Sequence, residues 1–111
     1  KTLPENILSF LQRVADPDVF SMRINDIIKL SSYSHSHFIK LFKTHVGKTL
    51  IEYITELRIS YAARLLSSTD MNIITISSKV GYDNQSFFAR KFKEKYHVSP
   101  VEYRNSFRNN Q

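Results

Sequence analysis

Two stretches of this chain repeat one pattern about fifty residues apart: residues 33–43 read YSHSHFIKLFK, and residues 82–93 read YDNQSFFARKFK. The second stretch has one extra residue in its first, turn-like part. Each copy places two aromatic residues four positions apart, as Phe38 and Phe42 are in the first. Residues with this spacing lie on one face of an α-helix. We therefore expect each copy to be a turn followed by an amphipathic helix.

The match between the two copies extends into the flanking sequence. The further corresponding pairs are Glu52-Tyr53 with Glu102-Tyr103, and Ile24 and Ile27 with Ile73 and Ile76. A short helix, a turn and a longer helix form the helix-turn-helix arrangement, whose second helix enters the DNA major groove. An aromatic pair beside a cationic stripe is also what one ordinary surface helix shows. Two unrelated surfaces have no reason to agree residue for residue, so the repeat favours the helix-turn-helix interpretation.

The rest of the chain predicts an all-α fold with seven helices. Only 2 Gly and 3 Pro occur in 111 residues, which leaves few turn residues for a β-sandwich or a glycine-rich nucleotide fold. Asp16-Pro17-Asp18 is expected to break the helical pattern. The expected helices are residues 4–15 with Pro4 at the first position, a segment carrying Ile24, Ile27, Ile28 and Leu30, residues 35–46 after Ser34 as N-cap, residues 50–68, a segment from Ile73 to Val80 after Asn72 as N-cap, residues 84–96, and residues 100–107.

Composition limits the function classes. The 16 Lys and Arg against 10 Asp and Glu give a net charge of +6, which suits a polyanionic partner, although charge alone is a weak signal. The chain has no Cys, which excludes disulfides, thiolate zinc sites and cysteine nucleophiles and fits a reducing cytoplasm. No apolar run approaches the roughly 20 residues that span a bilayer. We expect a cytoplasmic protein that does not enter a membrane.

Neither a metal site nor an active site is predicted. Among the 4 His, His35 and His37 are closest in sequence, but residues two apart on a helix point in divergent directions and cannot share an ion. No carboxylate pair, nucleophile motif or phosphate-binding glycine loop is present, so we expect no catalytic residue and no cofactor.

A module that docks an acidic protein through its basic faces stays open as an alternative. The steep salt dependence of phosphate neutralisation distinguishes DNA binding from it.

A larger set of residues carries a resemblance to a known family. The matching positions are Tyr53, Arg58, Ala62 and Leu65-Leu66 in the long helix, and then Gly81-Tyr82, Ser86-Phe87-Phe88, Arg90, Phe92-Lys93, Val98-Ser99-Pro100 and Glu102-Tyr103-Arg104. With them, the chain from about Ile7 to Arg104 resembles the DNA-binding domain of the AraC/XylS family. One departure is His97, which occupies the place that Gly47 has in the first copy.

The resemblance implies a bacterial transcriptional regulator, an activator more often than a repressor. It implies two helix-turn-helix subdomains, residues 4–48 and 70–107, joined by a linker helix over residues 50–68. Their recognition helices would enter successive major grooves about 34 Å apart, so that one chain covers about 20 base pairs of a promoter or operator. RNA polymerase is the further partner implied. We expect the chain, which opens at Lys1 without Met, to be part of a longer protein that has an effector-sensing or dimerisation domain and acts at the nucleoid.

Position by position, the resemblance also implies the residues that contact DNA. Arg90 is the strongest of them, because a guanidinium can bind guanine through two hydrogen bonds. Ile39 cannot hydrogen-bond a base, so it either contacts a thymine methyl group or the first unit reads less sequence. The implied base-reading residues are Ser36, His37, Ile39 and Lys40 in the first unit and Gln85, Ser86, Ala89 and Arg90 in the second. The implied phosphate contacts are Ser34, Lys43, Asn84, Lys91 and Lys93.

Overall fold

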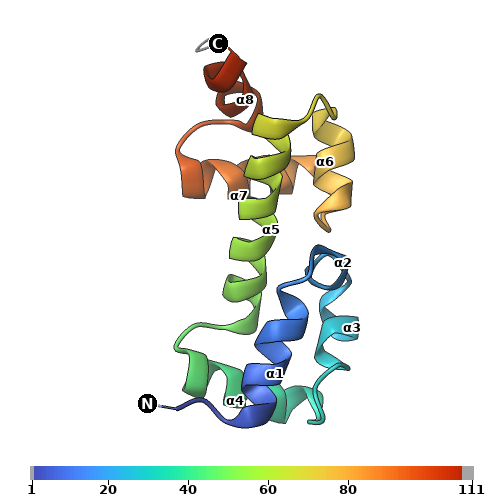
Figure 1. Ribbon diagram of the computed structural model, residues 1–111, viewed down its shortest axis with the longest axis vertical. Helices are drawn as coiled ribbons and strands as arrows, with labels where there is room; N and C mark the ends of the chain where they lie inside the picture. The colour runs from blue at the N-terminus through green and yellow to red at the C-terminus, as the bar shows by residue number, and fades with distance from the viewer. Residues whose placement is uncertain (1, 109–111) are drawn as a thin grey trace. The chain divides into compact units, whose positions relative to one another are not determined.

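The computed structural model describes residues 2–108, and within them all regular structure is helical. Figure 1 shows the helices in chain order, from blue to red. Their bounds are α1 Glu5–Val14, α2 Pro17–Phe20, α3 Ile24–Ile28, α4 His35–Val46, α5 Leu50–Ser68, α6 Ile73–Lys79, α7 Gln85–Tyr96 and α8 Pro100–Arg108. The all-α prediction is confirmed.

The described residues form eight helices, so the prediction of seven is wrong, and the additional helix is α2. Pro17 is its first residue, and the Asp16 carboxylate accepts a hydrogen bond of 2.8 Å from the Asp18 backbone N–H. Proline disfavours helical geometry in the residue before it but fits the first position of a helix itself. The segment expected to end one helix therefore also begins another. Pro4 is likewise the N-cap of α1 rather than its first residue.

The longer helices lie where the sequence predicts them. The bounds of α4 and α5 agree with the expected residues 35–46 and 50–68. α4 ends at Gly47, whose φ of 91° is in the left-handed region that glycine adopts at low cost. The predicted cap of α6 is also present, because the Asn72 side chain accepts a hydrogen bond of 2.8 Å from the Thr75 backbone N–H.

The chain divides into two compact units after Leu57, within α5. In the first unit, the core forms around three rings: the Phe10 centroid lies 4.6 Å from that of Phe38 and 6.0 Å from that of Phe42. Tyr53 of α5 meets Phe42 edge-on at 5.5 Å. The other buried apolar residues of this unit are Ile7, Val14, Phe20, Ile27, Ile28, Leu50 and Ile54.

The second unit repeats this core. Phe88 and Phe92 of α7 are buried, and Tyr103 of α8 meets Phe92 edge-on at 5.3 Å, as Tyr53 meets Phe42. The remaining core residues are Ile59, Ala62, Ala63, Leu65, Leu66, Ile76, Val80 and Tyr82. The first turns of α5 therefore pack against the core of the first unit in the way that α8 packs against the core of the second.

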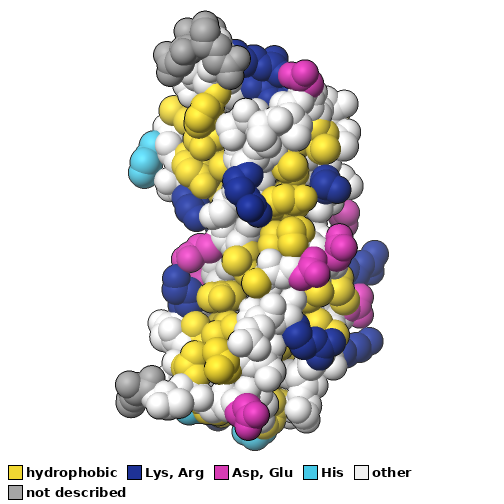
Figure 2. Space-filling model, viewed as in Figure 1, with side chains coloured by type: hydrophobic (Ala, Val, Ile, Leu, Met, Phe, Trp, Pro, Cys, Tyr) yellow, Lys and Arg dark blue, Asp and Glu magenta, His cyan; other side chains and the backbone are white. Residues whose placement is uncertain are grey.

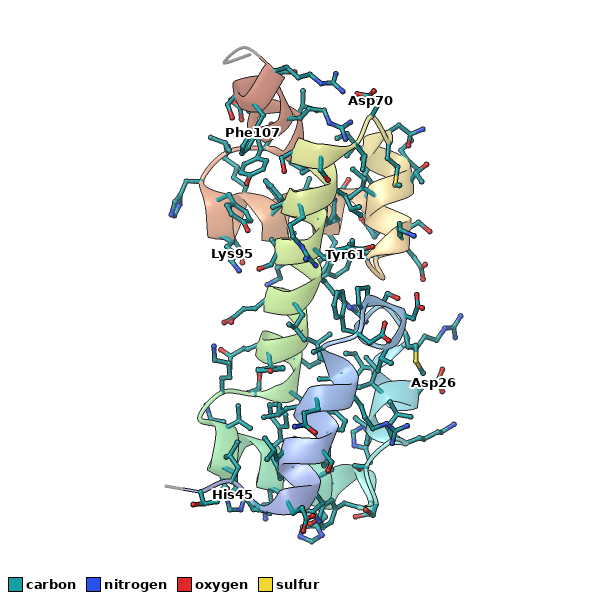
Figure 3. All side chains as sticks on the ribbon, in the orientation of Figure 1. Asp26, His45, Tyr61, Asp70, Lys95 and Phe107 are labelled. Carbon is teal, nitrogen blue, oxygen red and sulfur yellow. The ribbon has the colours of Figure 1, made fainter. Side chains whose placement is uncertain are left out.

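The C-terminal end of α5 is held by a buried arginine from α8. The Arg104 guanidinium donates to the backbone carbonyls of Leu66 and Thr69 at 3.0 and 3.1 Å. These carbonyls lie at the helix end, where a cation is favoured. Arg108 adds an ion pair of 2.7 Å to Asp70, which follows the helix end (Figure 3).

Matching capping boxes begin α5 and α8. The Thr49 backbone N–H donates to the Glu52 carboxylate at 2.8 Å, and the Glu52 N–H donates to the Thr49 hydroxyl at 3.1 Å. Ser99 and Glu102 form the same pair at 2.9 and 3.1 Å. Because the backbone N–H donates to the charged form, the pKa of each Glu lies below its ordinary value. The repeat therefore extends to the hydrogen bonds of the helix ends.

One equivalent position differs in backbone cost. His97 ends α7 with φ 67°, in the left-handed region, where Gly47 ends α4. Both N–H groups close the last helical turn, at 2.8 Å to Lys93 and 3.0 Å to Lys43. A side chain in this conformation costs about 1–2 kcal/mol, part of which glycine loses again through its greater freedom in the unfolded chain.

His97→Gly should therefore raise the free energy of unfolding by about 1 kcal/mol. The reciprocal change Gly47→His should lower it by a similar amount, since a Cβ built there meets no heavy atom within 4 Å apart from its chain neighbours, and the backbone conformation is the main penalty. Urea unfolding followed by circular dichroism measures both. Equal effects of the same sign would show that the left-handed conformation does not set the difference.

Candidate nucleic-acid interface

α4 and α7 have the same pattern of exposure along their length. From residue 35 to 50 and from 85 to 100, buried, half-buried and exposed residues follow each other in identical order. Lys40 lies two residues from each buried phenylalanine of α4, and therefore about half a turn away from that face. Arg90 has the same position in α7. The two helices thus present one cation each at the centre of an outward face.

The residues expected to contact bases lie largely on these two outward faces. In α4, Ser36, His37 and Lys40 are exposed and Ile39 is half-buried. In α7, the exposed members of the expected set are Gln85, Ser86 and Arg90, and Ala89 is half-buried. Each group comes from a single helix, so the helix geometry alone brings its members together. His37 also packs its ring against Tyr33, 5.0 Å between centroids.

The residues expected to contact phosphate are placed less uniformly. Lys43 and Lys93 are exposed at equivalent positions of the two outward faces. Lys91 is half-buried and forms an ion pair of 3.4 Å with Glu94. Of the other α7 cations, Lys95 points to α5, where its Nζ donates to the Ser60 hydroxyl at 2.7 Å (Figure 3). Arg90 and Lys93 are therefore the main cations of the outward face of α7.

The starts of the two helices differ. The Asn84 side-chain oxygen accepts a hydrogen bond of 2.9 Å from the Phe87 backbone N–H. Ser34, at the equivalent position before α4, is the N-cap residue but forms no side-chain capping hydrogen bond. The oxygen of Asn84 is thus engaged in the helix start, which leaves its amide NH₂ for a phosphate.

Phe87 also lies on this face, although the sequence pattern did not single it out as a contact residue. The residue is 37% exposed, and its ring centroid lies 5.1 Å from the guanidinium carbon of Arg90 and 5.5 Å from the Lys91 ammonium. The Phe87 ring also packs on Tyr82 at 5.7 Å. The available signal was a second aromatic residue directly before Phe88, where the helical period requires only one to be buried.

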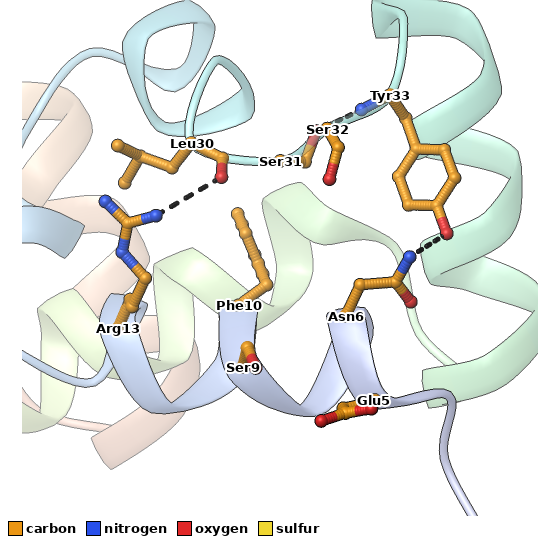
Figure 4. A pocket seen from close by; sticks show the side chains of 9 residues that line it. All are labelled: Glu5, Asn6, Ser9, Phe10, Arg13, Leu30, Ser31, Ser32 and Tyr33. Carbon is orange, nitrogen blue, oxygen red and sulfur yellow. Dashed lines mark hydrogen bonds between the residues drawn. The ribbon is translucent and has the colours of Figure 1, made fainter.

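A hollow of about 500 Å³ lies between α1 and the turn before α4 (Figure 4). Two hydrogen bonds cross from α1 to this turn: Asn6 donates to the Tyr33 hydroxyl, and Arg13 donates to the Leu30 carbonyl at 3.4 Å. Phe10 forms part of its lining and is also central to the core of the unit. These contacts tie the turn, and with it the start of α4, to the first helix.

Charge is distributed in small groups. On the face drawn in Figure 2, Lys and Arg side chains occur singly or in small groups, with uncharged and hydrophobic atoms between the groups. Among residues 2–108, no group of three or more His, Asp or Glu could hold a metal ion, and no helix is long and apolar enough to cross a membrane. The position of a cation on α4 or α7 is therefore more informative than the number of cations.

Comparison with known proteins gives a consistent assignment. A family model described as a helix-turn-helix domain matches residues 28–106. The lactose operon transcription activator of Staphylococcus xylosus is 36% identical over 84 residues, which are 76% of this chain and 30% of that protein. The C-terminal domain of AraT, a response regulator from Geobacillus stearothermophilus, has a TM-score of 0.82 at 28% identity, covering 96% of this chain and 88% of that one.

A third likeness concerns the fold alone. The DNA-binding domain of AdpA, solved in complex with a target DNA, has a TM-score of 0.84 at 16% identity and covers 97% of both chains. The present chain spans about three tenths of the length of three of the curated relatives it matches, at 28%, 27% and 30%. These three matches therefore concern one part of longer regulators.

Asn84→Ala should lower the free energy of unfolding by about 1 kcal/mol, because it removes a side-chain cap from a long helix. Ser34→Ala is the matched control and should cost only about a few tenths of a kcal/mol, since Ser34 forms no such hydrogen bond. Thermal unfolding of both variants measures the difference. Equal losses would mean that the two caps are equivalent in solution.

Proposed function

The chain belongs to the AraC/XylS family of bacterial helix-turn-helix transcriptional regulators, and on this premise we propose that it binds a specific duplex DNA sequence through the outward faces of α4 and α7. The single observation that carries the proposal is the identical order of buried and exposed positions along these two helices, each with a cation opposite its buried phenylalanine pair. The AdpA domain, which has the same fold and was solved with a target DNA, supports the same class of ligand.

The arrangement on DNA follows from the use of two recognition helices. α4 and α7 each enter a major groove, and successive grooves on one side of the duplex are about 34 Å apart. A single chain then covers about 20 base pairs, and its site need not be palindromic because the two helices differ in sequence. α5 serves as the linker helix between the subdomains of residues 4–48 and 70–107.

The roles of the contact residues follow from their chemistry. Arg90 binds a guanine edge, and Gln85 and Ser86 supply neighbouring hydrogen bonds. Ala89 and Ile39 contribute apolar contacts, of which a thymine methyl group is the natural partner. In α4, Ser36, His37 and Lys40 read bases, but fewer of their hydrogen-bond donors are held in a fixed position. The residues proposed to bind phosphate are Ser34, Lys43, Asn84, Lys91 and Lys93.

Regulation is proposed from the names of the relatives. The similar Staphylococcus xylosus protein is named a transcription activator, so we propose activation, by contact with RNA polymerase, in the cytoplasm at the nucleoid. An effector-sensing or dimerisation domain in the parent protein would control DNA binding. The chain acts as a binding module and not as an enzyme.

Selection from a randomised duplex pool tests the proposal. A defined non-palindromic site of about 20 base pairs should emerge, with affinity that falls log-linearly as salt is raised. Equal affinity for all duplexes at moderate salt would refute sequence-specific binding, and a basic module that docks an acidic protein would show no preference among them.

Two variants divide base reading from phosphate binding. Arg90→Ala should cost about 1–3 kcal/mol on the selected site and relax the preference at one base pair. Lys43→Ala should weaken all duplexes alike and make the salt dependence shallower by about one unit. Unchanged base preference in Arg90→Ala would remove Arg90 from the residues that read sequence.

A further inference from the structure

A series of ring and cation contacts leads from the core of the second unit to the outward face of α7. The Arg90 guanidinium carbon lies 5.1 Å from the Phe87 ring centroid, and the Phe87 ring lies 5.7 Å from that of Tyr82. Beyond Tyr82, the Arg58 guanidinium carbon lies 5.3 Å from the Tyr82 ring. The order from inside to outside is thus a buried cation, a buried ring, a half-exposed ring and an exposed cation.

The inner part of this series of contacts is fixed. Tyr82 is 8% exposed and Arg58 is 7% exposed. The Arg58 guanidinium also donates to the Gly81 carbonyl at 3.4 Å, and the buried Ser77 hydroxyl donates to the Tyr82 carbonyl at 3.2 Å. Phe87 therefore packs against the ring of Tyr82, whose backbone is hydrogen-bonded to α6. This contact restricts the position of the Phe87 ring.

The outer cation is free to bind a ligand. Among residues 2–108, Arg90 forms no ion pair and no side-chain hydrogen bond, and its described contact is the ring face of Phe87. A guanidinium attracted to the face of an aromatic ring does not use its N–H donors for that contact. The contact with Phe87 thus restricts the Arg90 side chain without using its donors. Less conformational entropy is then lost when it binds.

The first unit has the same frame without this series of contacts. Lys40 occupies the position of Arg90, and His37 occupies that of Phe87. The His37 ring packs against Tyr33, and Lys40 forms no cation–ring contact among the described residues. An ammonium on a flexible stem also lacks the planar pair of donors that matches a guanine edge. The two units therefore differ in how firmly the outward cation is positioned, as well as in the chemistry of that cation.

We propose that Phe87 is a positioning residue that sets the base specificity of the second unit, by holding the Arg90 guanidinium ready to bind a guanine edge. This rests on the proposed function, in which Arg90 reads a base. Phe87 acts through Arg90 and contacts no base itself. This role also explains why an aromatic residue is exposed on a helix whose buried face is already filled by Phe88 and Phe92.

The test compares Phe87→Leu with Phe87→Tyr on the 111-residue chain. Leu keeps an apolar side chain but has no ring, whereas Tyr keeps the ring. The probes are the duplex selected from a randomised pool of about 20 base pairs and its single-base-pair substitutions. Phe87→Leu should reduce the preference at the base pair read by Arg90 by about two- to fivefold, the size of an exposed cation–ring contact, and Phe87→Tyr should retain it. Affinity for unrelated duplexes should change less than about twofold in both.

A double-mutant cycle separates positioning from direct contact. In the Arg90→Ala background, Phe87→Leu should cause no further loss of preference. A further loss of the same size there would overturn the proposal, because Phe87 would then contact the base independently. An undiminished preference in Phe87→Leu, with a relaxed one in Arg90→Ala, would overturn it while leaving the proposed function intact.

Two controls complete the design. Val101→Ala removes a different exposed apolar side chain of the second unit, 54% exposed, and should change neither preference nor affinity. Thermal unfolding of each variant checks that the unit is folded under the binding conditions. If Arg90→Ala itself left the preference unchanged, Arg90 would not read a base, and the inference would fail together with that part of the proposed function.

Discussion

The burial of one phenylalanine pair in each recognition helix is the constraint on which the structure depends. Phe38, Phe42, Phe88 and Phe92 are fully buried, and each second member meets a tyrosine of the next helix edge-on. Such rings contribute large apolar areas and a preferred geometry. Once the pair is buried, the helical period leaves no freedom in what faces outward. The same packing that stabilises each unit therefore aims Lys40 and Arg90.

The sequence was sufficient for this part because the signal is periodic and occurs twice. The bounds of α4 and α5, the left-handed end at Gly47 and the Asn72 cap follow from local rules that act within a few residues. α2 was missed because a proline both ends a preceding helix and fits the first position of a new one. The helix is too short to show an apolar period that would indicate which of the two applies at Pro17.

The interface was less predictable because it depends on contacts between side chains. Exposure of the expected contact residues on α4 and α7 follows from the helical period, but the engagement of Lys91 with Glu94 does not. Nor does the packing of Phe87 between Tyr82 and Arg90, which requires the turn before α7 to place Tyr82 beside that helix. Periodicity specifies a face, whereas tertiary packing decides which donors on it are free.

The division of the chain inside α5 limits how the two units can be separated. Leu50 and Ile54 belong to the core of the first unit, whereas Ile59, Ala62, Ala63, Leu65 and Leu66 belong to that of the second. A conventional dissection cuts a surface loop between two cores, but here the cut would fall within a continuous helix. A fragment of either unit would need its own part of α5 with a new helix end. Modular exchange of one unit between related regulators therefore requires junctions within α5 that preserve helical register.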